Sequence, residues 1–161
     1  MSFLQYLKAS AFSHWLSVSM AGAPTMIALH SVGMGIVVGL SLMISLRLHR
    51  VILGFDERLI PRLLTLAAWG LCLNLVTGLA IFITRGPEYL ASAMFLTKML
   101  LVAISATLMF WLRHRLSSAH PERATGAADE LAKRVSLVAT LTWFGAVITG
   151  RLIAYLSDLY R

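Results

Sequence analysis

Four long stretches of the chain are almost entirely apolar, and polar residues collect in the segments between them. The apolar stretches cover residues 24–46, 61–83, 91–111 and 135–156. Each is long enough for the roughly 20 residues that a helix needs to cross the hydrocarbon layer of a bilayer. The pattern predicts an all-α protein, a bundle of four transmembrane helices within a single membrane domain over residues 1–161.

The first segment, residues 1–23, has a different pattern. Between residues 3 and 18 the apolar side chains recur at helical spacing and most serines fall on the opposite side. This predicts an amphipathic helix that lies in the membrane interface, with Trp15 at headgroup depth. His14 falls within the apolar stripe, so we expect it to point toward the bilayer or the bundle. Polar residues interrupt any signal-peptide core, so we expect residues 1–23 to be retained.

Charge then fixes an expected topology. The 161 residues are 58% hydrophobic and 13% charged, with a net charge of +7. The basic residues do not form a nucleic-acid surface; they gather in the first and third connections and their flanks, whereas the second connection, an expected tight turn at residues 85–89, has only Arg85. Lys and Arg collect in cytoplasmic loops, which predicts that both termini and the second connection face outward. The third connection, about residues 117–130, is expected to be an extended polar loop.

Small and polar residues mark two expected packing faces. Gly35 and Gly39 form a GxxxG pair on the first crossing, which predicts close approach to a neighbouring helix. His30 is expected on a different face from this pair. On the second crossing a stripe of small and polar residues predicts a seam that faces other helices, with Asn74 hydrogen-bonded there: Gly70, Asn74, Thr77 and Gly78.

Three basic residues lie inside the apolar stretches: His30, Lys98 and Arg151. His30 is about six residues, or roughly 9 Å, from the outer end of its helix, and the other two lie at similar depth. An ionisable group near the centre of a membrane helix costs about 2.5–3.5 kcal/mol on insertion scales, so it usually has a functional partner. The three residues together predict an outer-leaflet site for an anionic or metallic ligand.

The residue types suit a haem. Neutral imidazole is a usual ligand of haem iron, and Arg and Lys pair with carboxylates. We expect His30 to ligate iron, with Arg151 and Lys98 near the propionates or a quinone. His14 is the best candidate for a second axial ligand. Alternatively, Lys98 and Arg151 extend toward the headgroups and His30 is only hydrogen-bonded within the bundle.

Other chemistry finds little support in the sequence. Cys72 is the only cysteine, which excludes an intrachain disulfide and a CxxCH haem attachment. No acidic residue lies inside any crossing, which argues against the usual carboxylate-based proton carrier, and no hydrolytic motif is present. His49 and His114 lie at basic cytoplasmic helix ends, so we do not expect a second haem there.

Several segments together resemble an uncharacterised bacterial family of four-helix membrane proteins, a domain of unknown function. They are residues 24–30 (PTMIALH), 89–98 (YLASAMFLTK), 143–145 (WFG) and 150–155 (GRLIAY). The likeness implies a multi-pass protein of the bacterial inner membrane. More distantly, the chain is similar to copper-resistance D and cytochrome b561-type membrane proteins, although the b561 pattern of two histidine pairs is not reproduced.

Two functions from different classes follow. The first is a b-type cytochrome-like electron-transfer subunit that binds one haem near the outer, periplasmic face. The second is a non-redox membrane subunit that anchors a larger respiratory complex or binds lipid. Copper transport is a weaker third option. In each case we expect an accessory or electron-transfer role, with the lipid bilayer and other membrane or periplasmic subunits as partners, rather than a stand-alone enzyme.

Overall fold

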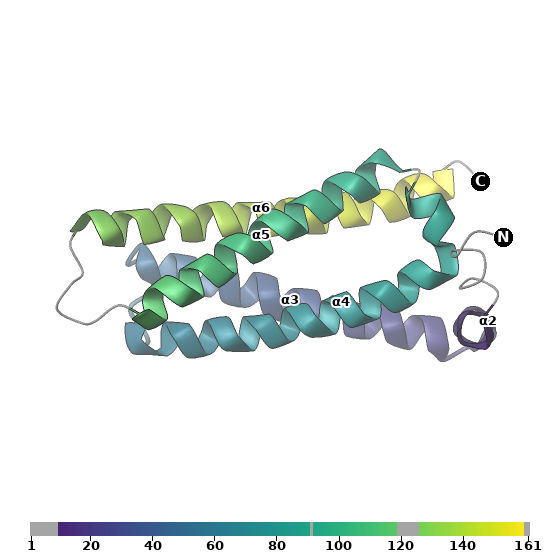
Figure 1. Cartoon of the computed structure of the whole chain (residues 1–161), viewed down its shortest axis with the longest axis horizontal. Coiled ribbons are helices and arrows are strands. Elements are labelled where there is room, and N and C mark those ends of the chain that lie inside the picture. Colours follow the sequence, from purple (N-terminus) through teal and green to yellow (C-terminus); the bar gives the residue numbers. More distant parts are fainter. Residues whose placement is uncertain (1–9, 91, 119–125, 160–161) are drawn as a thin grey trace.

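Helices account for all regular structure in the part of the chain that the computed structural model describes, residues 10–90, 92–118 and 126–159. In chain order they are α2 (Ala11–Val18), α3 (Gly22–Leu48), the 3-10 turn η1 (Glu57–Leu59), α4 (Ile60–Leu90), α5 (Ala93–Ser118) and α6 (Gly126–Leu159). Figure 1 shows α3 to α6 running lengthwise beside one another. The prediction of an all-α bundle is confirmed for these residues.

The four long helices each contain a stretch that is long and apolar enough to cross a membrane. Large apolar side chains lie on the outside of the bundle, among them Trp69, 69% exposed, and Leu100, 61% exposed. A continuous outward apolar surface of this kind is costly in water and is favourable against lipid. The chain is therefore a multi-pass membrane protein, and its bilayer environment agrees with the sequence prediction.

The bundle consists of two antiparallel helix pairs, α3 with α4 and α5 with α6. The chain reverses between the two members of each pair at one end, which we call the loop end (Figure 1). The opposite end, where α2 and the last residues of α6 lie, is called the terminal end.

Polar bonds join the two pairs toward the loop end. The Thr140 hydroxyl lies 3.1 Å from the carbonyl oxygen of Ser41 and 3.2 Å from its hydroxyl, and Ser136 donates to the Ser45 hydroxyl at 3.4 Å. The apolar core surrounds these bonds; its buried members include Val37, Ile44, Leu64, Met109 and Trp143. Bonds between membrane helices contribute about 0.6 kcal/mol each on average. They fix α3 against α6 over this half of the bundle.

Helices α3 and α4 approach each other most closely at two glycines. A Cβ atom on Gly33 would lie 2.8 Å from the carbonyl oxygen of Gly70 and 2.9 Å from the amide nitrogen of Asn74. A Cβ on Gly70 would lie 2.7 Å from a methyl carbon of Ile36. A side chain at Gly33 would therefore collide with the α4 backbone, and one at Gly70 with the branched side chain of Ile36, so both positions favour glycine.

The predicted packing face on α3 is wrong. A Cβ on Gly35 or Gly39 would meet no described atom within 4 Å, and both glycines are exposed. The contact face contains Gly33 instead. His30 lies one turn earlier on this contact face, and therefore on a different face from Gly35 and Gly39, as predicted. The predicted seam on α4 is confirmed, because Asn74 and Thr77 are buried and contact α3.

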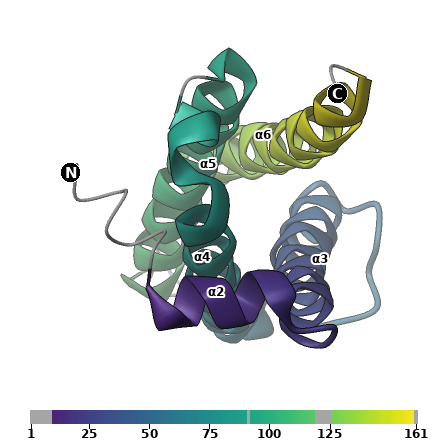
Figure 2. The same ribbon diagram turned by 90° about the vertical axis from the view of Figure 1, so that its right-hand side faces the viewer.

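Helix α2 lies across the ends of α3 and α4 at the terminal end (Figure 2). It covers eight residues, and residues 1–9 of the predicted longer helix lie outside the described residues. Ser13 and Leu16 are buried on the side toward the bundle, whereas His14 and Trp15 are exposed. The expected apolar stripe thus faces away from the bundle, which excludes the alternative in which His14 points into it. The interfacial location stays a prediction.

The expected tight turn at residues 85–89 is wrong, because α4 continues as a helix through Leu90. Figure 1 shows the last part of α4 turned toward the start of α5. Pro87 lies in this part and has no amide hydrogen to donate to the preceding turn, which is a common cause of such a bend. The third connection is also shorter than predicted, since α5 ends at Ser118 and α6 begins at Gly126.

The connection between α3 and α4 is tied to the end of α3. Arg50 adopts a left-handed backbone conformation with φ 59°, and Val51 donates its amide to the carbonyl of Leu46, as in a Schellman motif. Arg47 donates from Nε to the Phe55 carbonyl at 2.7 Å and stacks over the Phe55 ring. This arginine therefore holds the connection in place at the loop end.

Candidate functional site

His30 on α3 is held by backbone and side-chain groups of α4. Its Nδ1 atom lies 3.0 Å from the carbonyl oxygen of Asn74 and 3.2 Å from the Thr77 hydroxyl. A carbonyl oxygen only accepts, so Nδ1 carries the hydrogen and donates it. In the neutral ring, Nε2 then has a free lone pair, and no described residue donates to it.

Asn74 also donates a hydrogen bond to His30. Its side-chain nitrogen donates to the carbonyl oxygen of His30 at 2.9 Å, so the two residues exchange bonds in both directions. Thr77 donates its own hydroxyl to the carbonyl of Leu73 at 2.7 Å, which leaves its oxygen free to accept from His30. Asn74 and Thr77, which are buried in the α3–α4 interface, therefore hold the imidazole in one position and in one tautomer.

A cavity of about 970 Å³ lies at the terminal end, with His30 in its wall. Residues from all five described α-helices line it, and most of them are apolar. Phe82 on α4 and Phe95 on α5 stack within the lining, with ring centroids 5.7 Å apart. A large apolar cavity with a few polar groups is the usual form of a cofactor or ligand site.

Lys98 on α5 supplies the cationic group of this cavity. Its side chain lies against Gly150 of α6: a Cβ on that glycine would be 3.3 Å from Nζ. Among the residues that the structure describes, no carboxylate pairs with this ammonium and none lines the cavity. The described part of the cavity wall therefore presents one lysine and one histidine, and no carboxylate.

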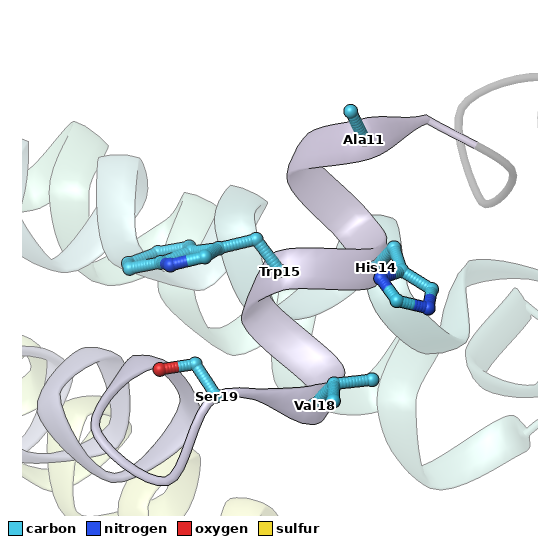
Figure 3. A pocket seen from close by; sticks show the side chains of 5 residues that line it. All are labelled: Ala11, His14, Trp15, Val18 and Ser19. Atoms are coloured by element: carbon cyan, nitrogen blue, oxygen red, sulfur yellow. The ribbon is translucent and has the colours of Figure 1, made fainter.

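Two of the four predicted site residues come together and two do not. His30 and Lys98 line the same cavity. His14 lines a separate shallow depression on α2, and Figure 3 shows it on one side of that helix with Trp15 on another. Arg151 is exposed and does not line the cavity, although its neighbour Gly150 does. The structure gives no support for His14 as the second ligand of an iron held by His30.

Bare metal ions find no matching site. Among the side chains that the structure describes, no group of three His, Cys, Asp or Glu is placed to hold one. A single imidazole suits a metal that brings most of its own ligands, as haem iron does.

Sequence reasoning missed the role of two glycines beside the polar groups, Gly78 against His30 and Gly150 against Lys98. Nothing in the sequence pattern distinguishes them from glycines that only pack.

Comparisons with protein-family models, curated protein sequences and solved structures give no match to this chain. The resemblance to a family of unknown function therefore stays a prediction. The fold and the site define the class: a multi-pass helical membrane protein with a mostly apolar cavity at one end of its bundle.

Proposed function

We propose that this chain is a membrane-embedded electron-transfer subunit that binds one haem b in the terminal-end cavity, with His30 as axial ligand. The observation that carries the proposal is the hydrogen bond from Nδ1 of His30 to the carbonyl of Asn74. Histidines that ligate metals almost always donate their other ring hydrogen to a carbonyl or carboxylate in this way. The bond fixes the tautomer that leaves Nε2 free for iron.

The rest of the cavity suits the same ligand. An apolar lining with the Phe82–Phe95 stack accommodates a flat macrocycle, and Lys98 offers a cation to a propionate. When bound, a haem would supply one-electron chemistry, whose potential depends on the axial ligand and its surroundings. The chain's own residues bind the group, orient the imidazole and exclude water from it.

The location follows from charge. Eight arginines and lysines flank the connections at the loop end: Arg47, Arg50, Arg58, Arg62, Arg113, Arg115, Lys133 and Arg134. By the positive-inside rule this end faces the cytoplasm, with both termini outside. The cavity then lies near the periplasmic face of a bacterial inner membrane, where another membrane subunit or a periplasmic subunit would exchange electrons with it.

A second candidate is a non-redox or quinone-binding subunit that holds a lipid-like molecule in the same cavity. One observation favours it: several lining side chains are exposed at the outer surface, including Leu79 at 61% and Met99 at 41%. A cavity bordered by lipid-facing residues can admit a hydrocarbon tail directly from the bilayer. Lys98 would then bind an acidic headgroup or a quinone oxygen.

Absorption spectra of variants distinguish the two candidates. The chain is expressed with ample haem and purified in mild detergent, as wild type, His30→Ala and His49→Ala. His49 is the matched control, because it bonds to Ser45 at the loop end, away from the cavity. We expect His49→Ala to retain the haem b bands and His30→Ala to lose them. Equal haem content in both variants would refute the assignment of His30, and a colourless wild type with co-purified lipid or quinone would favour the second candidate.

A further inference from the structure

We infer that Gly78 and Gly150 are positioning residues of the cavity, each of which lets one polar group lie flat against a helix. The inference rests on the proposed function for its ligand and on the geometry of the two glycines for its mechanism. We call the space that each glycine leaves on the surface of its helix a notch. The Gly78 notch is on α4 and the Gly150 notch is on α6, so they lie on different sides of the cavity. Together they set where His30 and Lys98 can meet a ligand.

Gly78 determines how close the imidazole can approach α4. A Cβ at this position would lie 3.0 Å from Cε1 and 3.4 Å from Nδ1 of His30. The first distance is shorter than an ordinary van der Waals contact, so an alanine would push the ring away from α4 by a few tenths of an ångström. The bond from Nδ1 to the Asn74 carbonyl, 3.0 Å long, would lengthen because the acceptor belongs to the α4 backbone.

Gly150 plays the same part for the lysine. A Cβ there would lie 3.3 Å from Nζ, 3.4 Å from Cε and 3.5 Å from Cδ of Lys98, so the end of the side chain runs along the bare α6 backbone. An alanine is nearly accommodated, since a lysine terminus is flexible. A valine adds two methyl groups beside the ammonium and must displace it.

Other glycines in the bundle provide the contrast. Gly35 and Gly39 on α3 have nothing within 4 Å of an added Cβ, so they leave both polar groups untouched. Among the described residues no glycine has a positive φ, so substitution at any of these helical positions does not strain the backbone. A difference between the two sets of variants therefore reports on the side chains beside Gly78 and Gly150.

The consequence is a preference for ligands with two polar ends. A molecule that binds His30 at one point and Lys98 at another must match the separation that the notches fix. The class this describes has an apolar body, an acceptor for the imidazole lone pair such as iron, and an anionic arm. Haem b with its propionates belongs to this class.

The first test reads His30 directly and needs no ligand. Solid-state NMR of the full chain in lipid bilayers, with ¹⁵N-labelled histidine, resolves protonated and unprotonated ring nitrogens. His30→Gln identifies the His30 signals. We expect Gly78→Ala and Gly78→Val to shift the Nδ1–H signal progressively, and Gly35→Ala and Gly35→Val to leave it unchanged. An unaltered Nδ1–H signal in both Gly78 variants would overturn the inference for this notch.

The second test uses haemin titrated into the detergent-solubilised chain. Loss of an outer-shell partner of a metal-bound histidine typically lowers affinity about 10–100-fold, and we expect Gly78→Val to fall in that range. Gly150→Val should weaken binding roughly 10-fold, as should Lys98→Met, because each removes one charge-assisted bond. Combining Gly150→Val with Lys98→Met should cost no more than either alone.

The outcomes separate the two proposals. If wild type does not bind haemin but Gly78 variants still shift the His30 signal, the haem assignment fails and the positioning role stands. If haemin binds through His30 but the glycine variants and Gly35→Val behave alike, the positioning role fails. Additive losses in the combined Gly150 and Lys98 variant would show that Gly150 acts on something other than the ammonium.

Discussion

Replacing Gly33 by alanine is the most informative perturbation of the bundle. The added Cβ would lie 2.8 Å from the Gly70 carbonyl oxygen and 2.9 Å from the Asn74 amide nitrogen, where ordinary contact begins at 3.4 Å. Both atoms belong to the α4 backbone and cannot rotate away. The two helices must therefore separate by roughly half an ångström at this point.

The expected cost comes from two sources. Forcing an extra methyl group into a closely packed interface typically costs about 1–3 kcal/mol. Separation also weakens the paired bonds between His30 and Asn74, at 3.0 and 2.9 Å, and bonds between membrane helices contribute about 0.6 kcal/mol each. We expect Gly33→Ala to lower the free energy of unfolding by about 2–4 kcal/mol.

Gly35→Ala is the matched control, two residues further along the same helix. It removes a glycine of the same conformation with nothing within 4 Å of the new methyl group. Helix propensity alone favours alanine by about 0.5–1 kcal/mol, so we expect no loss of stability. Reversible unfolding by SDS in mixed micelles, followed by circular dichroism, measures both variants. Equal stability of Gly33→Ala and Gly35→Ala would refute the assigned interface.

Three further predictions concern the loop end. Thr140→Val should lower the free energy of unfolding by about 0.6–1.7 kcal/mol in the same assay, because it removes the bonds to Ser41; no change would mean that these bonds do not stabilise the contact between α3 and α6. Arg47→Lys should destabilise by about 1 kcal/mol, because lysine cannot present the Nε–H that meets the Phe55 carbonyl at 2.7 Å; a neutral result would show that charge suffices there. In a background without Cys72, the cysteine of a Gly54→Cys variant should react with a membrane-impermeant maleimide only after the membrane is permeabilised. Labelling in intact cells would show that the loop end faces outward, opposite to the proposed topology.

The sequence predicted the elements well and their rotation poorly. Apolar run length identified the four crossings, because a bilayer imposes a minimum length that few other structures need. The seam at Asn74 and Thr77 was also predicted, because buried polar groups in a membrane require partners. By contrast, the GxxxG spacing of Gly35 and Gly39 shows that they share a face of α3 and does not say which helix lies opposite. Gly33, which makes the contact, has no such motif.

The candidate site was half predicted for the same reason. Counting residues from the end of a predicted crossing gives the depth of a side chain in the membrane. This depth correctly placed His30 and Lys98 near each other. It does not give direction around the helix, where neighbouring residues differ by 100°. Gly150 therefore lines the cavity while Arg151 is exposed. His14 failed similarly, because its stripe was apolar and yet faces away from the bundle.

The haem content of the purified wild-type chain tests the central claim most directly. A pyridine haemochrome assay gives the amount of haem b per chain when haem is supplied during expression, and the reduced-minus-oxidised spectrum shows whether it is redox-active. The cavity, with His30 as its one histidine among the described residues, predicts one redox-active haem b per chain. A folded protein with no haem, or with two haems per chain, would contradict it.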